Sequence, residues 1–309
     1  MSEAASVGFI GLGRMGVPMV ANLVRAGHDV HGFDLSSVAR DRVQQTGATV
    51  HPDLADMAGR VDVLILILPD SGVVERVVED CLASGVLRPG VLMIDMSSSE
   101  PARTRALALG LAPAGVRVVD APVSGGVGGA ERGDLTIMAG GDPRDVEDAR
   151  VFLEPLGSVS AVGALGAGHA MKALNNLLSA THLWITGEVM AAGAHFGLDP
   201  HVMVDAFNSS SGRSGSTEKK WPSFVLPATF DSGFALGLMV KDMRIALDLC
   251  ETVGGFRTLS EASVAMWEQA AESLPAESDH TQIATWIVER GGRVDVYSEG
   301  SYDRTPKRA

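Results

Sequence analysis

The chain has 309 residues, of which 46% are hydrophobic and 20% charged, a composition typical of globular proteins that excludes a largely disordered chain. Its 25 Lys and Arg residues against 38 Asp and Glu residues give a formal net charge of -13, which argues against general affinity for nucleic acid. Glycine is enriched at 36 residues, and such an excess without a collagen-like period indicates tight turns, close packing and ligand loops.

Cysteine content and hydropathy bear on the cellular setting. Cys81 and Cys250 are the only cysteines, so no disulfide framework is expected, and a reducing, cytoplasmic setting is favoured. Segment 1–6 has no basic residue before the first apolar run, so we expect no signal peptide. The longest weakly charged stretch, 173–187, is too short and too polar to cross a membrane.

The first half of the chain alternates short apolar runs with amphipathic stretches. Strands are predicted at 7–10, 30–34, 48–50, 63–68, 91–94, 116–119 and 135–139. Several of these runs lack polar alternation, as expected when helices cover both faces of a parallel sheet. Segment 15–26 has a helical pattern, with Gly27 as its C-terminal cap. Repeated strand and helix units predict an α/β fold with a doubly wound, Rossmann-type sheet, which we place at residues 1–163.

Strand signals fade after about residue 162, and helical periods take their place. Helices are predicted at 168–196, 200–207, 238–253 and 260–272. The first of these carries Ala and Gly at close intervals, which lets another helix pack closely against it. We therefore expect an all-helical domain at 164–309, with a frayed tail at 302–309.

A glycine-rich turn lies between the first predicted strand and the first predicted helix. It matches G-x-G-x-x-G and consists of Gly11, Leu12, Gly13, Arg14, Met15 and Gly16. In dinucleotide-binding proteins the first glycine permits the turn, the second lets backbone approach a pyrophosphate, and the third lets the helix pack on the strand. The helix N-terminus offers free N–H groups to the phosphates. We interpret the turn as cofactor-binding; the alternative is a turn that only joins a strand to a helix.

Asp34 ends the second predicted strand, 18 residues after Gly16. A carboxylate at this position accepts hydrogen bonds from the adenosine ribose and repels a 2′-phosphate, which favours NAD over NADP as the cofactor. Arg14 and Arg40 are the cations that a 2′-phosphate would need nearby. The alternative is that Asp34 only caps the following turn with Ser36.

Four ordered motifs resemble those of the β-hydroxyacid dehydrogenases, the family that includes 3-hydroxyisobutyrate dehydrogenase. They are the opening run 8–19 (GFIGLGRMGVPM) with Asn22-Leu23, the substrate loop 120–126 (DAPVSGG), the catalytic helix 166–172 (GAGHAMK) with Asn176, and the second lysine motif Lys241-Asp242. The resemblance covers residues 7–290. It implies a Rossmann domain, a helical domain and oxidation of a small 3-hydroxy acid with a nicotinamide cofactor.

The resemblance assigns roles to residues beyond the glycine turn. Ser124, Gly125 and Gly126 are implied to bind the substrate carboxylate, for which a hydroxyl and consecutive backbone N–H groups are suited. A plain Gly-rich turn is the alternative. Residues implied to contact the cofactor are Leu68, Pro69, Ser98 and Lys241. Lys241 is also implied to lie near the substrate, and its alternative is a solvated ion pair.

Lys172 and Asn176 are four residues apart, so they share a face of the predicted helix. Burial of a lysine on an uncharged helix would lower its pKa toward the range useful for proton transfer. The resemblance makes Lys172 the general acid/base and gives Asn176 the role of holding the substrate or the lysine. The alternative is a surface lysine whose stem packs on the helix.

The remaining motifs narrow the function further. The eight histidines show no metal-ligand spacing, so no metal site is expected, and the lack of G-x-S-x-G argues against a hydrolase. His169 is interpreted as a helix-terminal histidine. Loop 208–214 either places Arg213 over an acidic substrate or is solvated.

We therefore expect NAD-dependent oxidation of a 3-hydroxyisobutyrate-like acid to its semialdehyde. The alternatives are a reductase of tartronate, glyoxylate or succinic semialdehyde, using NADPH or NADH, and a catalytically silent dinucleotide-binding regulator. The small carboxylate is the expected partner, with neither nucleic acid nor membrane. The long helix favours a homodimer or homotetramer.

Overall fold

The structure is a computed structural model that describes residues 5–290, so the tail expected at 302–309 lies outside the described residues. Contacts divide the chain into two compact units between Ala173 and Leu174. The strands of the first unit are β1 (Val7–Ile10), β2 (Val30–Phe33), β3 (Thr49–Val50), β4 (Val63–Leu66), β5 (Leu92–Asp95), β6 (Arg117–Asp120), β7 (Val123–Ser124), β8 (Leu135–Gly140) and β9 (Gly157–Gly163).

The helices of the first unit follow or separate these strands. They are α1 (Gly16–Arg25), α2 (Ser37–Gln44), α3 (Leu54–Ala58), α4 (Ser71–Ala83), α5 (Pro101–Leu111), η1 (Ala112–Ala114), α6 (Gly126–Arg132), α7 (Pro143–Leu153), η2 (Glu154–Leu156) and the start of α8 (Ala167–Phe196). Acidic caps fix several of their starts: the side chains of Asp70 and Asp142 accept the N–H groups of Val73 and Arg144.

Within the described part of the chain, nine strands form one sheet in the order β3-β2-β1-β4-β5-β6-β8-β7, with β9 paired to β8. The first six run parallel, whereas β8 is antiparallel to β6 and β7. The order 3-2-1-4-5-6 is that of the Rossmann fold, and it reverses direction between β1 and β4. Ligands bind in the crevice beyond the carboxyl ends of strands at such a reversal.

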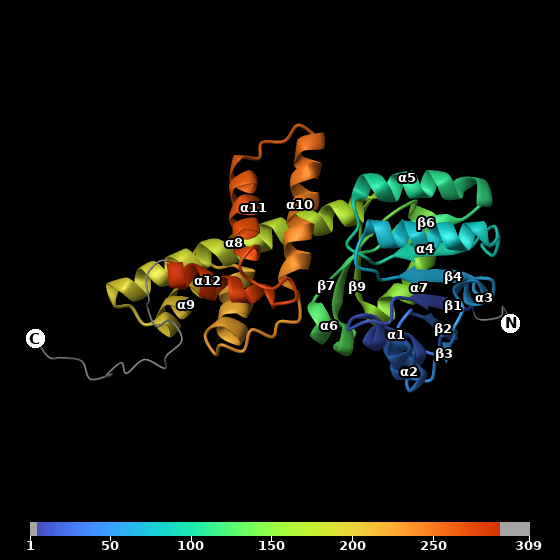
Figure 1. The fold of residues 1–309 in the computed structure, drawn as a ribbon, viewed down its shortest axis with the longest axis horizontal. Helices are drawn as coiled ribbons and strands as arrows, with labels where there is room; N and C mark the ends of the chain where they lie inside the picture. The colour runs from blue at the N-terminus through green and yellow to red at the C-terminus, as the bar shows by residue number, and fades with distance from the viewer. Residues whose placement is uncertain (1–4, 291–309) are drawn as a thin grey trace, which may run out of the picture. The chain divides into compact units, whose positions relative to one another are not determined.

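Helices cover both faces of this sheet, and Figure 1 shows α4 and α5 on one side with α1 on the other. Successive residues of β1 enter different cores: Phe9 packs with α1 residues such as Met19, and Ile10 packs with α4 residues such as Val74. All four residues of β1 are buried. Burial on both faces explains why the strand sequences show no polar alternation.

The second unit is helical. It contains most of α8, followed by α9 (Pro200–Asn208), η3 (Ser216–Val225), α10 (Leu236–Thr252), α11 (Thr258–Ala271), η4 (His280–Gln282) and α12 (Ile283–Arg290). Its core includes the fully buried side chains of Trp221 and Trp267. Residues 5–290 include no helix with both the length and the apolar character required to cross a bilayer.

The predicted fold class, a doubly wound sheet followed by helices, is confirmed, and the seven predicted strands form within a few residues of their expected bounds. Two strands escaped prediction. β9 has mostly exposed or half-buried residues, and β7 is only two residues long. Neither offers the apolar run that identified the others.

Candidate active site

The glycine turn after β1 has the geometry that a pyrophosphate requires. Gly11 has φ +98°, a left-handed conformation, and a Cβ at Gly16 would overlap the Gly11 carbonyl oxygen. A Cβ at Gly13 would meet no protein atom. Internal packing therefore explains the first and third glycines, whereas the second leaves an open backbone surface for a ligand. The turn fits a dinucleotide at the N-terminus of α1.

Asp34 follows β2 and faces the same turn. Its Oδ2 accepts the N–H of Leu12 at 2.8 Å, and its Oδ1 accepts the N–H of Ser36 at 2.8 Å. Arg40 Nη1 donates to the Asp34 carbonyl oxygen at 2.5 Å, and Arg14 is exposed. The carboxylate is therefore fixed beside the glycine turn at the end of β2, and the capping contact with Ser36 exists as well.

The loops after β4 and β5 are joined through a serine. The N–H of Leu68 donates to Ser97 Oγ at 2.9 Å. Buried Asp95 shapes the second loop by accepting the N–H of Ser97 at 2.9 Å and the hydroxyl of Ser99 at 2.8 Å. Ser98, between these two buried serines, is half-buried. Both loops lie at the carboxyl ends of β4 and β5, where a cofactor would bind.

The Ser-Gly-Gly segment leaves the sheet at β7. Ser124 pairs with Thr136 of β8, and the left-handed backbone at Gly125 and Gly126 turns the chain into α6. Ser124 and Gly126 are half-buried and Gly125 is exposed. The segment thus presents a hydroxyl and backbone N–H groups of the kind that bind carboxylates.

Asp120 anchors the start of α8. It ends β6, is fully buried, and accepts the N–H of Gly166 at 2.7 Å and that of His169 at 2.8 Å, one on each carboxylate oxygen. Burial raises the pKa of Asp120, and the positive charge of His169 and these two N–H groups act against that rise. The carboxylate therefore satisfies N-terminal N–H groups that the helix itself leaves without partners.

His169 is buried among polar groups of three elements. Thr104 Oγ1 donates its one hydrogen to the Glu100 carbonyl at 3.1 Å, so at 2.8 Å it accepts a hydrogen from His169 Nδ1. His169 Nε2 lies 3.7 Å from Asp95 Oδ2. The prediction of a helix-terminal histidine is confirmed, and the side chain has no exposed surface for a substrate.

The helix α8 carries the predicted catalytic pair on one face. Lys172 is 7% exposed and Asn176 is 5% exposed, so the surface-lysine alternative does not describe this side chain. The division between the two units falls between these residues. Each unit is compact, and α8 runs through both.

Asn176 is oriented by a carboxylate of α10. Its Nδ2 donates to Asp242 Oδ2 at 2.6 Å, and Asp242 Oδ1 forms an ion pair with Lys241 Nζ at 2.8 Å. Asp242 is 1% exposed. Asp242 accepts one of the two hydrogens of the Asn176 amide nitrogen, and the amide oxygen accepts from Asn175 Nδ2 at 3.2 Å, so the orientation of the amide is fixed.

The chain is similar to known dehydrogenases along most of its length. The family model described as the NAD binding domain of 6-phosphogluconate dehydrogenase matches residues 6–166, and that described as NAD-binding of NADP-dependent 3-hydroxyisobutyrate dehydrogenase matches residues 166–287. The 2-(hydroxymethyl)glutarate dehydrogenase of Eubacterium barkeri is 38% identical over 80% of this chain and 83% of its own. The chain belongs to the 3-hydroxyisobutyrate dehydrogenase family.

Two further relatives cover even more of this dehydrogenase. The NAD-dependent L-serine dehydrogenase of Pseudomonas aeruginosa is 33% identical over 90% of this chain and 96% of its own. The solved structure of Mycobacterium tuberculosis 3-hydroxyisobutyrate dehydrogenase with L-serine has a TM-score of 0.85 and 32% identity, covering 92% of this chain and 99% of the other. The expected β-hydroxyacid dehydrogenase family is confirmed, and the chain is an NAD(P)-dependent oxidoreductase.

The sequence interpretation gave no role to Asp120 or Asp242, although each stands in a recognised motif. The backbone partners of Asp120 are 46 and 49 residues away, and Asn176, which donates to Asp242, is 66 residues away from it. A single sequence shows no such pairing. A carboxylate at the end of a predicted strand, or next to a motif lysine, is the signal that was available.

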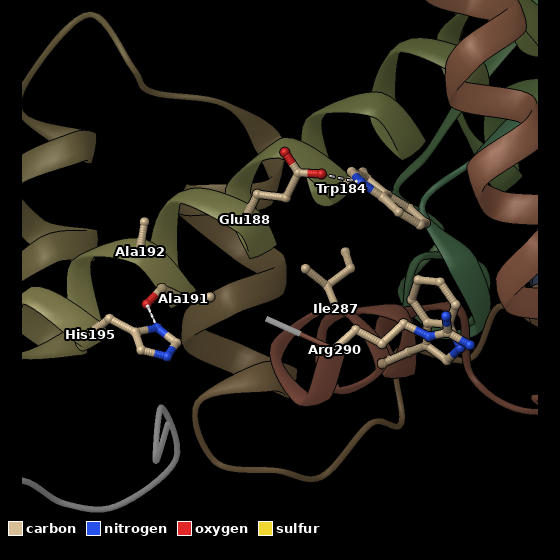
Figure 2. Close-up of a pocket in the computed structure, with 8 residues that line it drawn as sticks. Trp184, Glu188, Ala191, Ala192, His195, Ile287 and Arg290 are labelled. Atoms are coloured by element: carbon tan, nitrogen blue, oxygen red, sulfur yellow. Dashed lines mark hydrogen bonds between the residues drawn. The ribbon is translucent and has the colours of Figure 1, made fainter. Parts of the chain in front are cut away.

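The helical unit contains a cavity with a volume of about 430 Å³. Its lining comes from α8 and α12 and includes Trp184, Glu188, His195 and Arg290, which Figure 2 shows. Trp184 Nε1 donates to Glu188 Oε1 at 2.7 Å. None of the residues predicted to bind substrate or cofactor lines it.

Arg213, in the loop at 208–214, is exposed and pairs with Glu218 at 3.3 Å, which favours the interpretation of this loop as solvated.

Proposed function

We propose that this dehydrogenase oxidises a small 3-hydroxy acid to its semialdehyde, with NAD as the cofactor and Lys172 as general acid/base. The observation that carries the proposal is a buried lysine on α8, one turn from an asparagine that Asp242 holds in place. The start of the same helix is hydrogen-bonded to Asp120 at the carboxyl end of β6. Proton transfer requires such a positioned group.

The roles of the residues follow from the chemistry of the substrate. Ser124 and the N–H groups of Gly125 and Gly126 bind its carboxylate. Lys172 Nζ takes the hydroxyl proton, and Asn176 holds the hydroxyl oxygen toward the lysine. A bound NAD would supply the hydride acceptor for the carbon that bears the hydroxyl. The resemblance to the family implies that Lys241, which forms an ion pair with Asp242, contacts the cofactor or the substrate.

The cofactor preference rests on Asp34. Its carboxylate is held by two backbone N–H groups beside the glycine turn, where the adenosine ribose of a bound dinucleotide lies. A negative charge fixed there repels the 2′-phosphate of NADP. Arg40 donates to backbone carbonyls of Asp34 and Leu35, which turns its guanidinium to the chain itself. These contacts support NAD over NADP.

Steady-state kinetics with 3-hydroxyisobutyrate, 3-hydroxypropionate, L-serine, glycerate and 2-(hydroxymethyl)glutarate test the proposal. The acids are chosen because the relatives are named for acids with a hydroxymethyl group beside a carboxylate. We expect NADH formation with at least one acid, and a kcat/KM for NAD at least about tenfold above that for NADP, which corresponds to ~1.4 kcal/mol. No turnover with any acid, or a higher kcat/KM with NADP, would contradict it.

We also propose that the helical unit forms a homodimer or homotetramer. Apolar side chains spaced four and seven residues apart form an exposed stripe along α8, consisting of Leu174, Leu178, Ile185, Val189 and Phe196. Exposed apolar stripes of this kind mark interfaces. Sedimentation at micromolar concentration is expected to show an oligomer, and Leu178→Glu is expected to shift it toward the monomer. A monomeric unaltered chain would refute the interface.

A further inference from the structure

Lys220 lies against the face of α8 that carries Asn176. It belongs to η3, is half-buried, and its Nζ donates to Ser179 Oγ at 2.9 Å. Ser179 follows Asn176 by three residues on α8, which places it nearly one turn further along, about 4.5 Å by axial rise. The ammonium group therefore lies within a turn of the asparagine proposed to hold the substrate.

The local structure holds this lysine in place. The next residue, Trp221, is fully buried, and the preceding turn is tied by the hydrogen bond from Asn208 Nδ2 to the Thr217 carbonyl at 3.0 Å. The neighbouring Lys219 is exposed, as expected for an ordinary surface lysine. Lys220 is thus directed toward α8 by an anchored segment.

Several groups bear on the charge around Lys220. His280 is 4% exposed, and burial, followed by the positive charge of Lys220, lowers the pKa of His280 to about 3, although the negative charge of Asp279 acts to raise it. The imidazole is therefore neutral at physiological pH. On α10, the carboxylate of Asp242 is taken up by Asn176 and Lys241. Lys220 therefore shares its surroundings with the neutral imidazole of His280 and with the carboxylate of Asp279, which acts on the same imidazole.

We infer that Lys220 and Ser179 form a second anion subsite, which selects 3-hydroxy acids whose C2 substituent ends in a carboxylate. This inference rests on the proposed function and names its substrate class. Since Ser179 Oγ accepts from Nζ, its own hydrogen can donate to an incoming oxygen. One ammonium and one hydroxyl match one carboxylate, whereas phosphate is usually held by several cationic donors. A short carbon chain spans the single helical turn from Asn176.

The test compares 2-(hydroxymethyl)glutarate with 2-(hydroxymethyl)pentanoate, in which a methyl group replaces the terminal carboxylate. The measured quantity is the ratio of kcat/KM for the diacid to that for the monoacid, with NAD saturating. We expect the unaltered enzyme to favour the diacid and Lys220→Met to lower the ratio by about 10- to 100-fold, the range for one charged hydrogen-bonding contact. Lys220→Arg is expected to retain most of the preference.

Lys219→Met is the matched control, because it removes an exposed lysine from the adjacent position, and we expect it to leave the ratio unchanged. A ratio that Lys220→Met does not alter would overturn the subsite, including the case in which both substrates lose activity equally. If neither of these two acids is oxidised, calorimetry decides the subsite separately, and the proposed function itself fails only if none of the other acids tested above is oxidised either. Glutarate binding more tightly than pentanoate, with the difference abolished in Lys220→Met, supports it, and equal binding overturns it.

Discussion

Replacement of Lys172 by alanine is expected to abolish turnover while NADH still binds. The side chain is buried on α8 within one turn of Asn176, and loss of a positioned proton-transfer group costs about 10²- to 10⁴-fold in rate. Asp34 is held beside the glycine turn by the backbone N–H groups of Leu12 and Ser36, so we expect this region to remain intact in the variant. Single-turnover and steady-state kinetics give kcat, and quenching of protein fluorescence by NADH gives the cofactor Kd.

Two controls separate proton transfer from a structural effect of Lys172→Ala. Lys219→Ala removes an exposed lysine and is expected to leave kcat within about twofold, as for most surface substitutions. Small primary amines added to Lys172→Ala are expected to restore part of the rate, because they supply a proton acceptor in the space left by the side chain. Retention of more than a few per cent of kcat would contradict the assignment.

The elements that the sequence predicted best are those determined by neighbouring residues. The turn at 11–16 requires glycines at fixed spacing between a buried strand and a helix, and the structure has this arrangement. η3 is different: it is a π-helix with Pro222 inside, so its residues lack the 3.6-residue period on which helix prediction depends. β9 lies beside β8, and its exposed serines gave no apolar signal.

Only those residues of the candidate site that stand in a short sequence motif could be predicted from the sequence. The glycine turn, Lys172 and Asn176 each stand in a local pattern; the pattern itself gave the turn its role, and resemblance to a family supplied the roles of Lys172 and Asn176. The contacts of Asp120 with the start of α8 and of Lys220 with Ser179 join residues more than 40 positions apart. Such contacts follow from how strands and helices pack, so composition and periodicity do not reveal them.

Asp120→Asn is expected to lower the free energy of unfolding by about 2–5 kcal/mol. Each oxygen of the buried carboxylate accepts one backbone N–H, from Gly166 and from His169. An asparagine has one oxygen and an NH₂ group, so it satisfies one N–H and places a donor against the other. Because the start of α8 carries these N–H groups, we also expect a lower kcat, since Lys172 lies three residues after His169.

Urea unfolding followed by tryptophan fluorescence measures the loss, and Asp134→Asn is the matched control. Asp134 pairs with Arg132 at 2.8 Å on the surface, with 55% of its side chain exposed, so its replacement is expected to cost less than about 1 kcal/mol. An unfolding free energy for Asp120→Asn within that same range would show that the two N–H groups find other partners. In that case the hydrogen bonds from Gly166 and His169 would not determine where α8 begins, and the position of Lys172 would depend on the packing of the helix instead.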